Sequence, residues 1–407
     1  MHGPLAQSVE QKTFNLLVDG SNPSRPTNAR QGFRSDPGPF FFFAIAISSQ
    51  ASPPQALSPS NKACLAGAAL REFWDQGSRE FRMSAKPAAS ITDELWTRLH
   101  SDIDPSQHFP EVAPKLAHYT SLFTAEAIFK GDEFWMSHPF LMNDQEELRW
   151  GIVNGTDRFV ESKAISAAVA SEDHHRIVIE ALQDARDTDG TKHSYDTYIA
   201  CFSKHDPGDK DGLLSMWRAY GADGGGVAIV FDLSRLAEDT GSPLIIAPVE
   251  YLSTRQRFEW MDWAIAQTAD AIKALGPTAD PSDLILAVRY YYARLRRAAL
   301  FSKHESFSEE KEWRIVYDPT ADESGGKYDE LMSYAITPKG IQPKLKLRLG
   351  TKAIGKPWHL EDIIEAIILG PTGGSLIAEH AMRRLCVAAG KPKLSGKVFS
   401  SSTPYRP

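Results

Sequence analysis

The sequence predicts an α+β protein with a mixed or antiparallel central sheet and helical insertions. Two observations lead to this prediction. Segments with strand character are short and are mixed with helical segments that cluster in a few stretches. No internal repeat is found along the chain, so solenoid and propeller architectures are not expected.

The first part of the folded region is expected to run helix, strand, helix, strand. The segment Ser90 to Asp93 resembles a capping box, and apolar residues then recur at helical spacing. Gly131 is expected to stop the second helix, because glycine often ends helices. The expected elements are an amphipathic helix through Leu95, Trp96, Leu99 and Ile103, a strand Lys115–Thr120, a helix Thr124–Lys130 and a strand Glu133–Ser137.

The rest of the chain is expected to contain five more strands and several helices, two of them long. Ser282 follows Pro281 and is typical of a helix N-cap. Two long helical stretches, at about 253–274 and 282–303, look like an insertion. The other expected elements are helices across 145–187, a strand Tyr198–Ser203, a helix Leu213–Tyr220, a strand Val227–Asp232, a strand around Glu312, strands Leu345–Leu349 and Ile363–Leu369, and a helix Ser375–Ala389.

The composition excludes several classes of protein. The 407 residues are 42% hydrophobic with a net charge of -7, which gives no overall attraction to nucleic acid. Cys64, Cys201 and Cys386 are widely separated, so neither a disulfide framework nor a zinc site is expected and a reducing cytoplasm fits. No apolar run reaches the ~20 residues that a membrane span needs.

Residues 1–82 differ from the rest, because they are rich in Pro, Ser, Gly and Ala and lack periodicity. They are expected to be disordered. The apolar run Phe40–Ile47 lies too far from the start for a usual signal peptide. The segment Leu5–Thr27 is similar to the peptide made when a bacterial tRNA gene is translated, so the extension is alternatively spurious and Met83 the true start. Residues 83–112 are then an N-terminal helix and linker, and 113–407 one domain.

The segment from Phe307 to Tyr317 carries the most specific pattern. In a strand, Glu312 and Arg314 share one face, and Trp313 lies on the other with further apolar residues. The apolar face is expected to be buried, so the carboxylate and the guanidinium would point together into a cleft or into solvent. The simpler interpretation is a surface ion pair on a half-exposed strand.

Other polar residues stand at strand ends. His118 is expected to share a face with Leu116 and Thr120, opposite Tyr119, and a strand histidine is usually structural. Asn143 or Asp144 could cap the following helix or line a pocket. Gly224 to Gly226 precedes a strand and is expected to form a turn, because dinucleotide-binding glycines follow one. No metal-binding or acyl-transfer motif is found.

Taken in order, these motifs resemble the uncharacterised bacterial DUF2971 family over about residues 113–407. The residues that carry the resemblance are His118-Tyr119-Thr120, Trp135, Ser137, Asn143-Asp144 with Glu147, Cys201-Phe202-Ser203, Met216-Trp217-Arg218 with Tyr220-Gly221, Gly226 with Phe231-Asp232, Glu312 to Val316, Ile368 to Pro371, and Ser402 with Tyr405-Arg406.

The order of elements is also distantly similar to the ADP-ribosyltransferase superfamily, which implies an ADP-ribosyltransferase-like core and NAD+ as substrate. This resemblance implies that His118 contacts the nicotinamide ribose, that Glu312 stabilises the oxocarbenium ion and that Tyr119 or Trp135 stacks on nicotinamide. The catalytic candidates are therefore Glu312 and His118. The candidates for substrate or cofactor binding are Tyr119, Thr120, Trp135, Ser137, Asn143, Asp144, Ser203, Trp217, Arg218, Tyr220 and Arg314.

Three hypotheses about function follow. The first is a cytoplasmic NAD+-dependent transferase, a toxin or phage-defence effector, whose target is protein or nucleic acid. The second is a sensor that binds a nucleotide or metabolite without turnover, favoured because the separate tyrosine of the usual histidine-tyrosine-glutamate pattern is missing. The third is a hydrolase or nuclease that uses Glu312, Asp144 and Glu147. The first two need no metal and no membrane.

Overall fold

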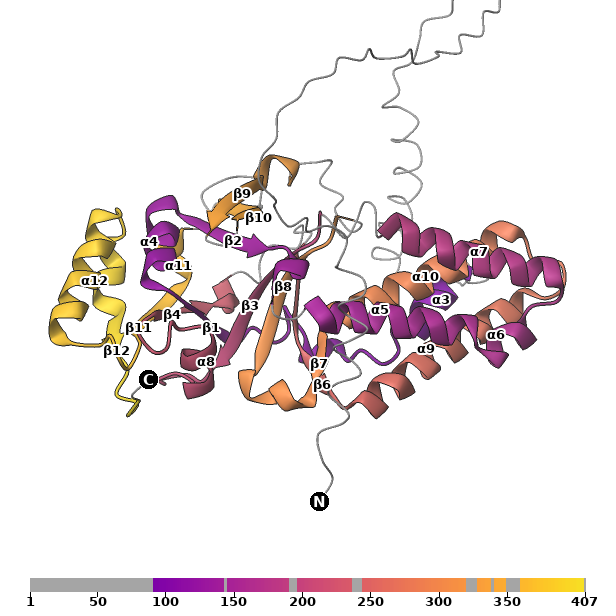
Figure 1. Ribbon diagram of the computed structural model, residues 1–407, viewed down its shortest axis with the longest axis horizontal. Helices are drawn as coiled ribbons and strands as arrows, with labels where there is room; N and C mark the ends of the chain where they lie inside the picture. Colours follow the sequence, from indigo (N-terminus) through magenta and orange to yellow (C-terminus); the bar gives the residue numbers. More distant parts are fainter. Residues whose placement is uncertain are drawn as a thin grey trace, which may run out of the picture. The chain divides into compact units, whose positions relative to one another are not determined.

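The computed structural model describes residues 91–142, 145–189, 196–235, 244–319, 328–337, 340–348 and 359–405. The extension 1–82, expected to be disordered or spurious, lies outside these residues, as do Asn143 and Asp144 and the side chain of Glu147. The described part combines helices with a sheet whose strand pairs are mostly antiparallel (Figure 1). This confirms the α+β prediction.

The large sheet is branched, because β3 has two neighbours along one edge. Its main path runs β12-β11-β4-β1-β3-β2-β10-β9, while β8 pairs with the other edge of β3 and β5 pairs with β8. The pairs are antiparallel except β11 with β12. The strands are β1 (Lys115–Thr120), β2 (Glu133–Ser137), β3 (Tyr198–His205), β4 (Val227–Asp232), β5 (Leu244–Pro248), β8 (Glu312–Tyr317), β9 (Met332–Thr337), β10 (Gly340–Arg348), β11 (Ile364–Leu369) and β12 (Val398–Ser400).

The expected strand-helix-strand opening is present. Helix α4 (Leu122–Gly131) joins β1 to β2, and the Ser121 side chain caps it by accepting a hydrogen bond from the Thr124 amide. The helix ends at Asp132, which adopts the left-handed conformation with φ 53°. Gly131 is thus the last helical residue, and Asp132 takes the special backbone conformation because acidic and amide side chains tolerate it better than most.

The two faces of the sheet bury different clusters. One face packs against α4, α11 (Leu360–Ile363) and α12 (Leu376–Ala388) and holds the largest apolar cluster. The other face is covered in one region by α8 (Leu214–Ala219), around Trp217. In a second region it is covered by Leu148, Leu300 and Phe301 from the helical part. The sheet is therefore buried on both sides where β3 and β8 pair.

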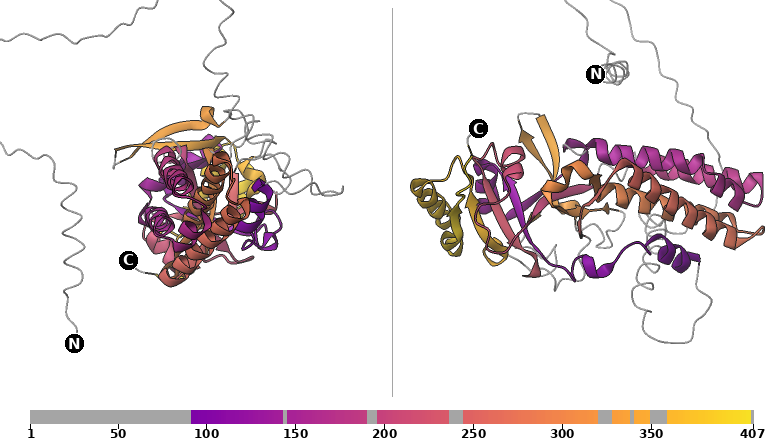
Figure 2. Two further views of the ribbon diagram at one scale, coloured as in Figure 1. Left: turned by 90° about the vertical axis from the view of Figure 1, so that its right-hand side faces the viewer. Right: turned by 90° about the horizontal axis from the view of Figure 1, so that it is seen from below.

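Helices far apart in sequence form a second apolar core. The bounds are α3 (Ile91–Leu99), α5 (Gln145–Val160), α6 (Lys163–Ala168), α7 (Glu172–Thr188), α9 (Thr254–Leu275) and α10 (Pro281–Leu300). Figure 2 shows α5, α7, α9 and α10 running side by side, and their facing apolar side chains form one cluster. Among the described residues, none of these helices combines the length and apolar character needed to cross a bilayer.

The predicted helices of the insertion agree with α9 and α10, except at one end. The second was expected to reach residue 303, but it ends at Leu300 because Ser302–His304 forms β7, which pairs in parallel with β6 (Glu250–Leu252). The sequence analysis also missed β5, β6, β9 and β12 and gave only the second half of β10. β5, β6 and β12 have at most five residues, so their period-2 signal is weak, whereas β9 does alternate Met332, Tyr334 and Ile336 with smaller residues.

The glycines at 224–226 form the predicted turn before β4. Gly224 has φ +78°, and its carbonyl accepts a hydrogen bond from the Thr372 amide. At Gly226 a Cβ would lie 2.3 Å from the Thr120 carbonyl oxygen and 2.8 Å from that of Gly221. Only a glycine fits here, because the β1–β4 pairing fixes the Thr120 carbonyl and the Gly221 carbonyl is held by the hydrogen bond that it accepts from the Gly226 amide.

We expect Gly226→Ala to lower the free energy of unfolding by about 2 kcal/mol, the size of an overpacking penalty. Urea denaturation followed by circular dichroism measures this change. Gly396→Ala is the matched control, because a Cβ there has open space around it. Equal unfolding midpoints for the two variants would show that the turn is not tightly packed.

Candidate functional site

Glu312 and Arg314 lie side by side on β8, as predicted, but both are buried. Their side chains are 4% and 3% exposed. The Arg314 Nε donates to Glu312 Oε1 at 2.8 Å, and its Nη1 donates to the Leu300 carbonyl at 2.6 Å. The expectation of a half-exposed strand facing solvent is therefore wrong, and Arg314 lines only a small hollow beside Leu148 and Leu300. The end of α10 covers this face, which the strand pattern by itself could not reveal.

A second pair of charges completes the network around Glu312. Lys303 on β7 is 1% exposed, and its Nζ lies 2.6 Å from Glu310 Oε2 and 3.4 Å from Glu312 Oε2. Burial raises the pKa of Glu312, but Arg314 and Lys303 outweigh this effect and hold that pKa below its ordinary value. We call Lys303, Glu310, Glu312 and Arg314 the buried ion network. Two cations and two carboxylates balance within it.

Neighbouring polar groups hold the network in place. The Tyr251 hydroxyl accepts a hydrogen bond from the Glu312 amide at 2.7 Å. Two of the residues expected to bind substrate, Ser203 and Tyr220, lie next to the buried ion network. The Ser203 hydroxyl donates to the Glu310 carbonyl at 2.7 Å, and the Tyr220 hydroxyl donates to the Glu310 carboxylate at 3.3 Å. Both contacts fix Glu310 on the short 3-10 helix Glu305–Glu310, so these residues support structure.

His118 lies on the opposite face of the sheet from Glu312. Ala117 pairs with Ser203, and Ser203 pairs with Glu312, so these three side chains share one face. His118 follows Ala117 and points to the other face. There its ring contacts Phe134 and Phe202 at centroid distances of 5.3 and 5.7 Å. The two proposed catalytic residues therefore do not face a common ligand.

The remaining candidates are spread over two further places. Trp135 and Ser137 share a face with Glu312. Ser137 pairs with Ile199 on β3, whereas Glu312 pairs with Ser203. These two β3 positions are four residues apart, so Ser137 lies about 13 Å along the strand direction from Glu312. The Ser137 hydroxyl accepts from Lys344 Nζ at 2.8 Å. The Trp135 indole donates to Glu133 at 2.9 Å and carries the Lys346 ammonium 4.2 Å above its ring.

Tyr119 on β1 and Trp217 on α8 form a third group, where α8 packs on the sheet. The Tyr119 hydroxyl accepts from the Leu213 amide at 2.8 Å, and burial raises its pKa to about 12. The Trp217 ring packs edge-on against it and donates to the Asp211 carbonyl. Thr120 is buried at the end of β1, and Arg218 is exposed, with its guanidinium 5.3 Å above the Tyr405 ring. These residues are packed or at the surface.

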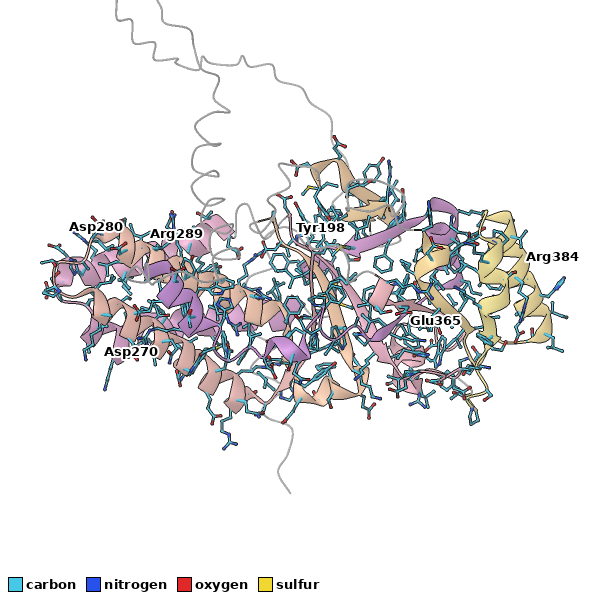
Figure 3. All side chains as sticks on the ribbon, turned by 180° about the vertical axis from the view of Figure 1, so that it is seen from behind. Tyr198, Asp270, Asp280, Arg289, Glu365 and Arg384 are labelled. Carbon is cyan, nitrogen blue, oxygen red and sulfur yellow. The ribbon has the colours of Figure 1, made fainter. Side chains whose placement is uncertain are left out.

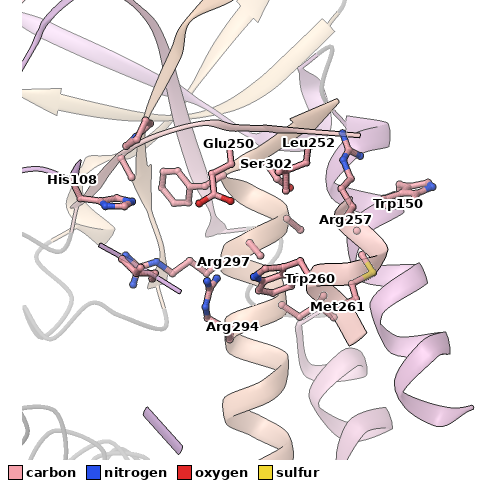
Figure 4. Close-up of a pocket in the computed structure, with 18 residues that line it drawn as sticks. His108, Trp150, Glu250, Leu252, Arg257, Trp260, Met261, Arg294, Arg297 and Ser302 are labelled. Atoms are coloured by element: carbon pink, nitrogen blue, oxygen red, sulfur yellow. The ribbon is translucent and has the colours of Figure 1, made fainter. Parts of the chain in front are cut away.

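A different hollow is lined by cationic and aromatic side chains. It lies where α5, α9 and α10 meet β5, β6 and β7 (Figure 4). Arg257, Arg294 and Arg297 come from α9 and α10, and Trp150 and Trp260 come from α5 and α9. We call this hollow the arginine pocket. The other lining residues are Ile103, His108, Gly151, Ala247, Pro248, Glu250, Leu252, Met261, Leu295, Ala298, Ala299, Phe301 and Ser302.

The three arginines of the pocket differ in what holds them. Arg294 is 7% exposed; it donates to Asp102 at 2.6 Å and stacks 4.9 Å above the Trp260 ring. Arg257 stacks 5.1 Å above the Trp150 ring. Arg297 is half-buried and forms no hydrogen bond or ion pair through its side chain with any residue that the structure describes. Burial and the nearby Arg294 lower the pKa of Arg297 from its ordinary value.

A comparison with known protein families finds a match that covers the residues of the buried ion network and the arginines of the pocket. Residues 216–315 match the model of a family described as a protein of unknown function, DUF2971. We refer to this matched segment as the DUF2971 region. No curated protein and no solved structure matches the chain. The matched segment runs from α8 into β8 and includes the buried ion network, the three arginines and Trp260. The resemblance outside 216–315 stays a prediction.

The sequence analysis did not identify the arginine pocket within the DUF2971 region. A signal was present, because Arg294 and Arg297 stand three residues apart on a predicted helix, as do Arg257 and Trp260 on the preceding one. Such spacing places each pair on one helix face. Charged residues on long helices usually face solvent, however, and the packing of β5 to β7 over the helices could not be read from the pattern.

The metal-dependent hypothesis finds no support in the described part of the chain. It holds no group of three or more His, Cys, Asp or Glu side chains arranged for a metal ion. Glu310 and Glu312 do approach a common point, but the Lys303 ammonium occupies it. Asp144 and the Glu147 side chain lie outside the described residues.

We expect Glu312→Gln to lower the free energy of unfolding by about 3 kcal/mol, because Arg314 and Lys303 would keep buried charge with one counter-ion fewer. Urea denaturation measures the loss. Glu365→Gln, in a partly exposed pair with Lys115, is the control and should lose under about 1 kcal/mol. Similar losses in the two variants would contradict a structural role for the network.

His118 should make stability depend on pH. Burial lowers its pKa, so between pH ~6.5 and the lower folded value the unfolded chain takes up a proton that the folded chain does not. Stability is therefore complete above pH ~6.5 and falls by at most about 1.4 kcal/mol per pH unit below it.

We expect His118→Gln to remove this part of the slope, measured by urea denaturation at pH 7, 6 and 5. His380→Gln, at an exposed helix position, is the control and should keep the wild-type slope. Burial also lowers the pKa of His100, to about 4, so part of the slope should remain; if the slope in His118→Gln equals that of the wild-type chain, His118 does not contribute.

Proposed function

We propose that the DUF2971 region binds a small anionic metabolite in the arginine pocket and does not transform it chemically. Arg297 carries the argument. Its guanidinium lies half-buried in a hollow with two further arginines, and no described carboxylate pairs with it. A charge in this position loses hydration, and Asp318, the carboxylate that favours the charged form of Arg297, forms its ion pair with Arg296 instead. A phosphate or carboxylate group in the pocket would supply a partner.

The chemistry of the arginine pocket fits this ligand class. Guanidinium groups bind phosphate and carboxylate through two parallel hydrogen bonds, which are stronger than neutral ones. The pocket wall is partly apolar, with Met261, Leu295 and Phe301, so an anion bound there would be shielded from water. The space suits a few water-sized groups rather than a whole dinucleotide, which favours a small metabolite over NAD+.

The arrangement of the residues favours binding over catalysis. A transferase of the expected type needs Glu312 and His118 at one ligand. Glu312 is enclosed by Arg314 and Lys303, and His118 lies on the other side of the sheet. The sensor hypothesis therefore has better support than the transferase hypothesis, although the site it uses lies away from the residues expected to bind.

We expect Arg297→Ala to weaken the binding of ethyl phosphate at least tenfold, the size expected from losing a hydrogen bond to a charged group. Ligand-observed NMR titration of the full chain measures the affinity. Arg289→Ala is the matched control, because Arg289 is exposed on the same helix (Figure 3) and pairs with Asp184. If the wild-type chain binds neither ethyl phosphate nor propionate, or if both variants bind with equal affinity, the proposal is refuted.

A second measurement separates binding from turnover. The full chain is incubated with NAD+ and the release of nicotinamide is followed by mass spectrometry. We expect no release above that of a buffer control. Release that disappears in a folded Glu312→Gln variant would overturn the proposal and establish the transferase.

A further inference from the structure

Glu250 brings a negative charge to the otherwise cationic arginine pocket. It begins β6, where it pairs with Ser302, and its amide donates to the Phe301 carbonyl at 2.8 Å. These backbone contacts fix the position of the residue. Figure 4 shows the Glu250 carboxylate projecting from the strand side of the pocket toward the side where Arg294 and Arg297 lie.

The carboxylate and the arginines do not neutralise each other. Glu250 forms no ion pair with a residue in the described ranges, although it lines the same hollow as Arg257, Arg294 and Arg297. Glu250 is exposed, so its carboxylate stays hydrated. An empty pocket therefore presents a negative group across from a positive one, with space between them.

We propose that the arginine pocket recognises a small zwitterion, whose phosphate or carboxylate binds at Arg297 and whose ammonium binds at Glu250. This inference rests on the proposed function, because it assumes the anion at Arg297. A ligand with only an anionic group would leave Glu250 facing that anion, at a cost in repulsion. An ammonium group on the same ligand turns this repulsion into attraction.

The remaining lining residues are compatible with a short ligand. Ser302 stands beside Glu250 through the β6–β7 pairing and can accept a hydrogen bond from an ammonium group. Phe301 and Met261 supply an apolar surface for the carbon chain between the two charged groups. The expected class is an aminoalkyl phosphate or an amino acid, which share the ammonium and differ in the anion.

Paired probes test this inference on the full chain. 2-Aminoethyl phosphate is compared with ethyl phosphate, and β-alanine with propionate, by ligand-observed NMR titration at low and high salt. Each pair differs by one ammonium group. We expect the ammonium to strengthen binding about threefold to tenfold, within the range of charge-assisted contacts at a partly exposed site. The preference should shrink at high salt because Glu250 is exposed.

Glu250→Gln should remove the preference for the ammonium while leaving the affinity for ethyl phosphate equal or higher. Glu259→Gln, which changes an exposed carboxylate on α9 outside the pocket lining, should keep the preference. The better-binding pair identifies phosphate or carboxylate as the anion.

The outcomes distinguish this inference from the proposed function. If ethyl phosphate or propionate binds in an Arg297-dependent way but the amino analogues bind no better, the zwitterion is refuted and anion binding stands. A preference that survives in Glu250→Gln refutes the assignment of the ammonium to Glu250. If no probe binds the wild-type chain, both the inference and the proposed function fail.

Discussion

The buried ion network of Lys303, Glu310, Glu312 and Arg314 is the ionic interaction around which the end of α10 meets the sheet, beside the apolar contacts of Leu300 and Phe301. Glu312 and Arg314 belong to a central strand of the sheet, while Lys303 follows the end of α10. Removing four charges from water is expensive, and the expense is compensated only when each charge keeps its partner and geometry. The network therefore constrains how the helical part meets the sheet.

This constraint also shapes the arginine pocket. Arg314 donates a hydrogen bond to the Leu300 carbonyl. The carbonyl of the next residue, Phe301, accepts a hydrogen bond from the Glu250 amide. Ser302 lines the pocket and directly precedes Lys303. One short segment, residues 300–303, thus contributes to the network and to the pocket wall. The positions of Phe301 and Ser302 in the pocket wall consequently depend on the network, which is itself buried.

The motifs that the sequence analysis singled out turn out to serve packing in several places. Tyr119 and Trp217 hold the segment before α8, Gly226 lets the turn before β4 approach the end of β1, and Ser203 and Tyr220 fix Glu310. Side chains of this kind form specific patterns because buried polar groups need defined partners. A specific pattern of polar residues is therefore as much a signature of structure as of catalysis.

The sequence by itself determined much of the secondary structure and which side chains share a strand face. Periods of 2 and 3.6 placed Glu312 with Arg314, separated His118 from Tyr119, and marked the two long helices, because these are local properties of the backbone. It could not place the candidate site. His118 and Glu312 looked compatible along the chain, yet the β1–β3–β8 register puts them on opposite faces.

Only the tertiary structure decided what covers each face. The end of α10 buries Glu312 and Arg314, and the packing of β5 to β7 against α9 and α10 brings Arg257, Arg297 and Glu250 to one pocket. The burial of a side chain and the charges that face it depend on segments that are distant in sequence. Periodicity predicts the face of the element on which a side chain lies, but not which residues pack against that face.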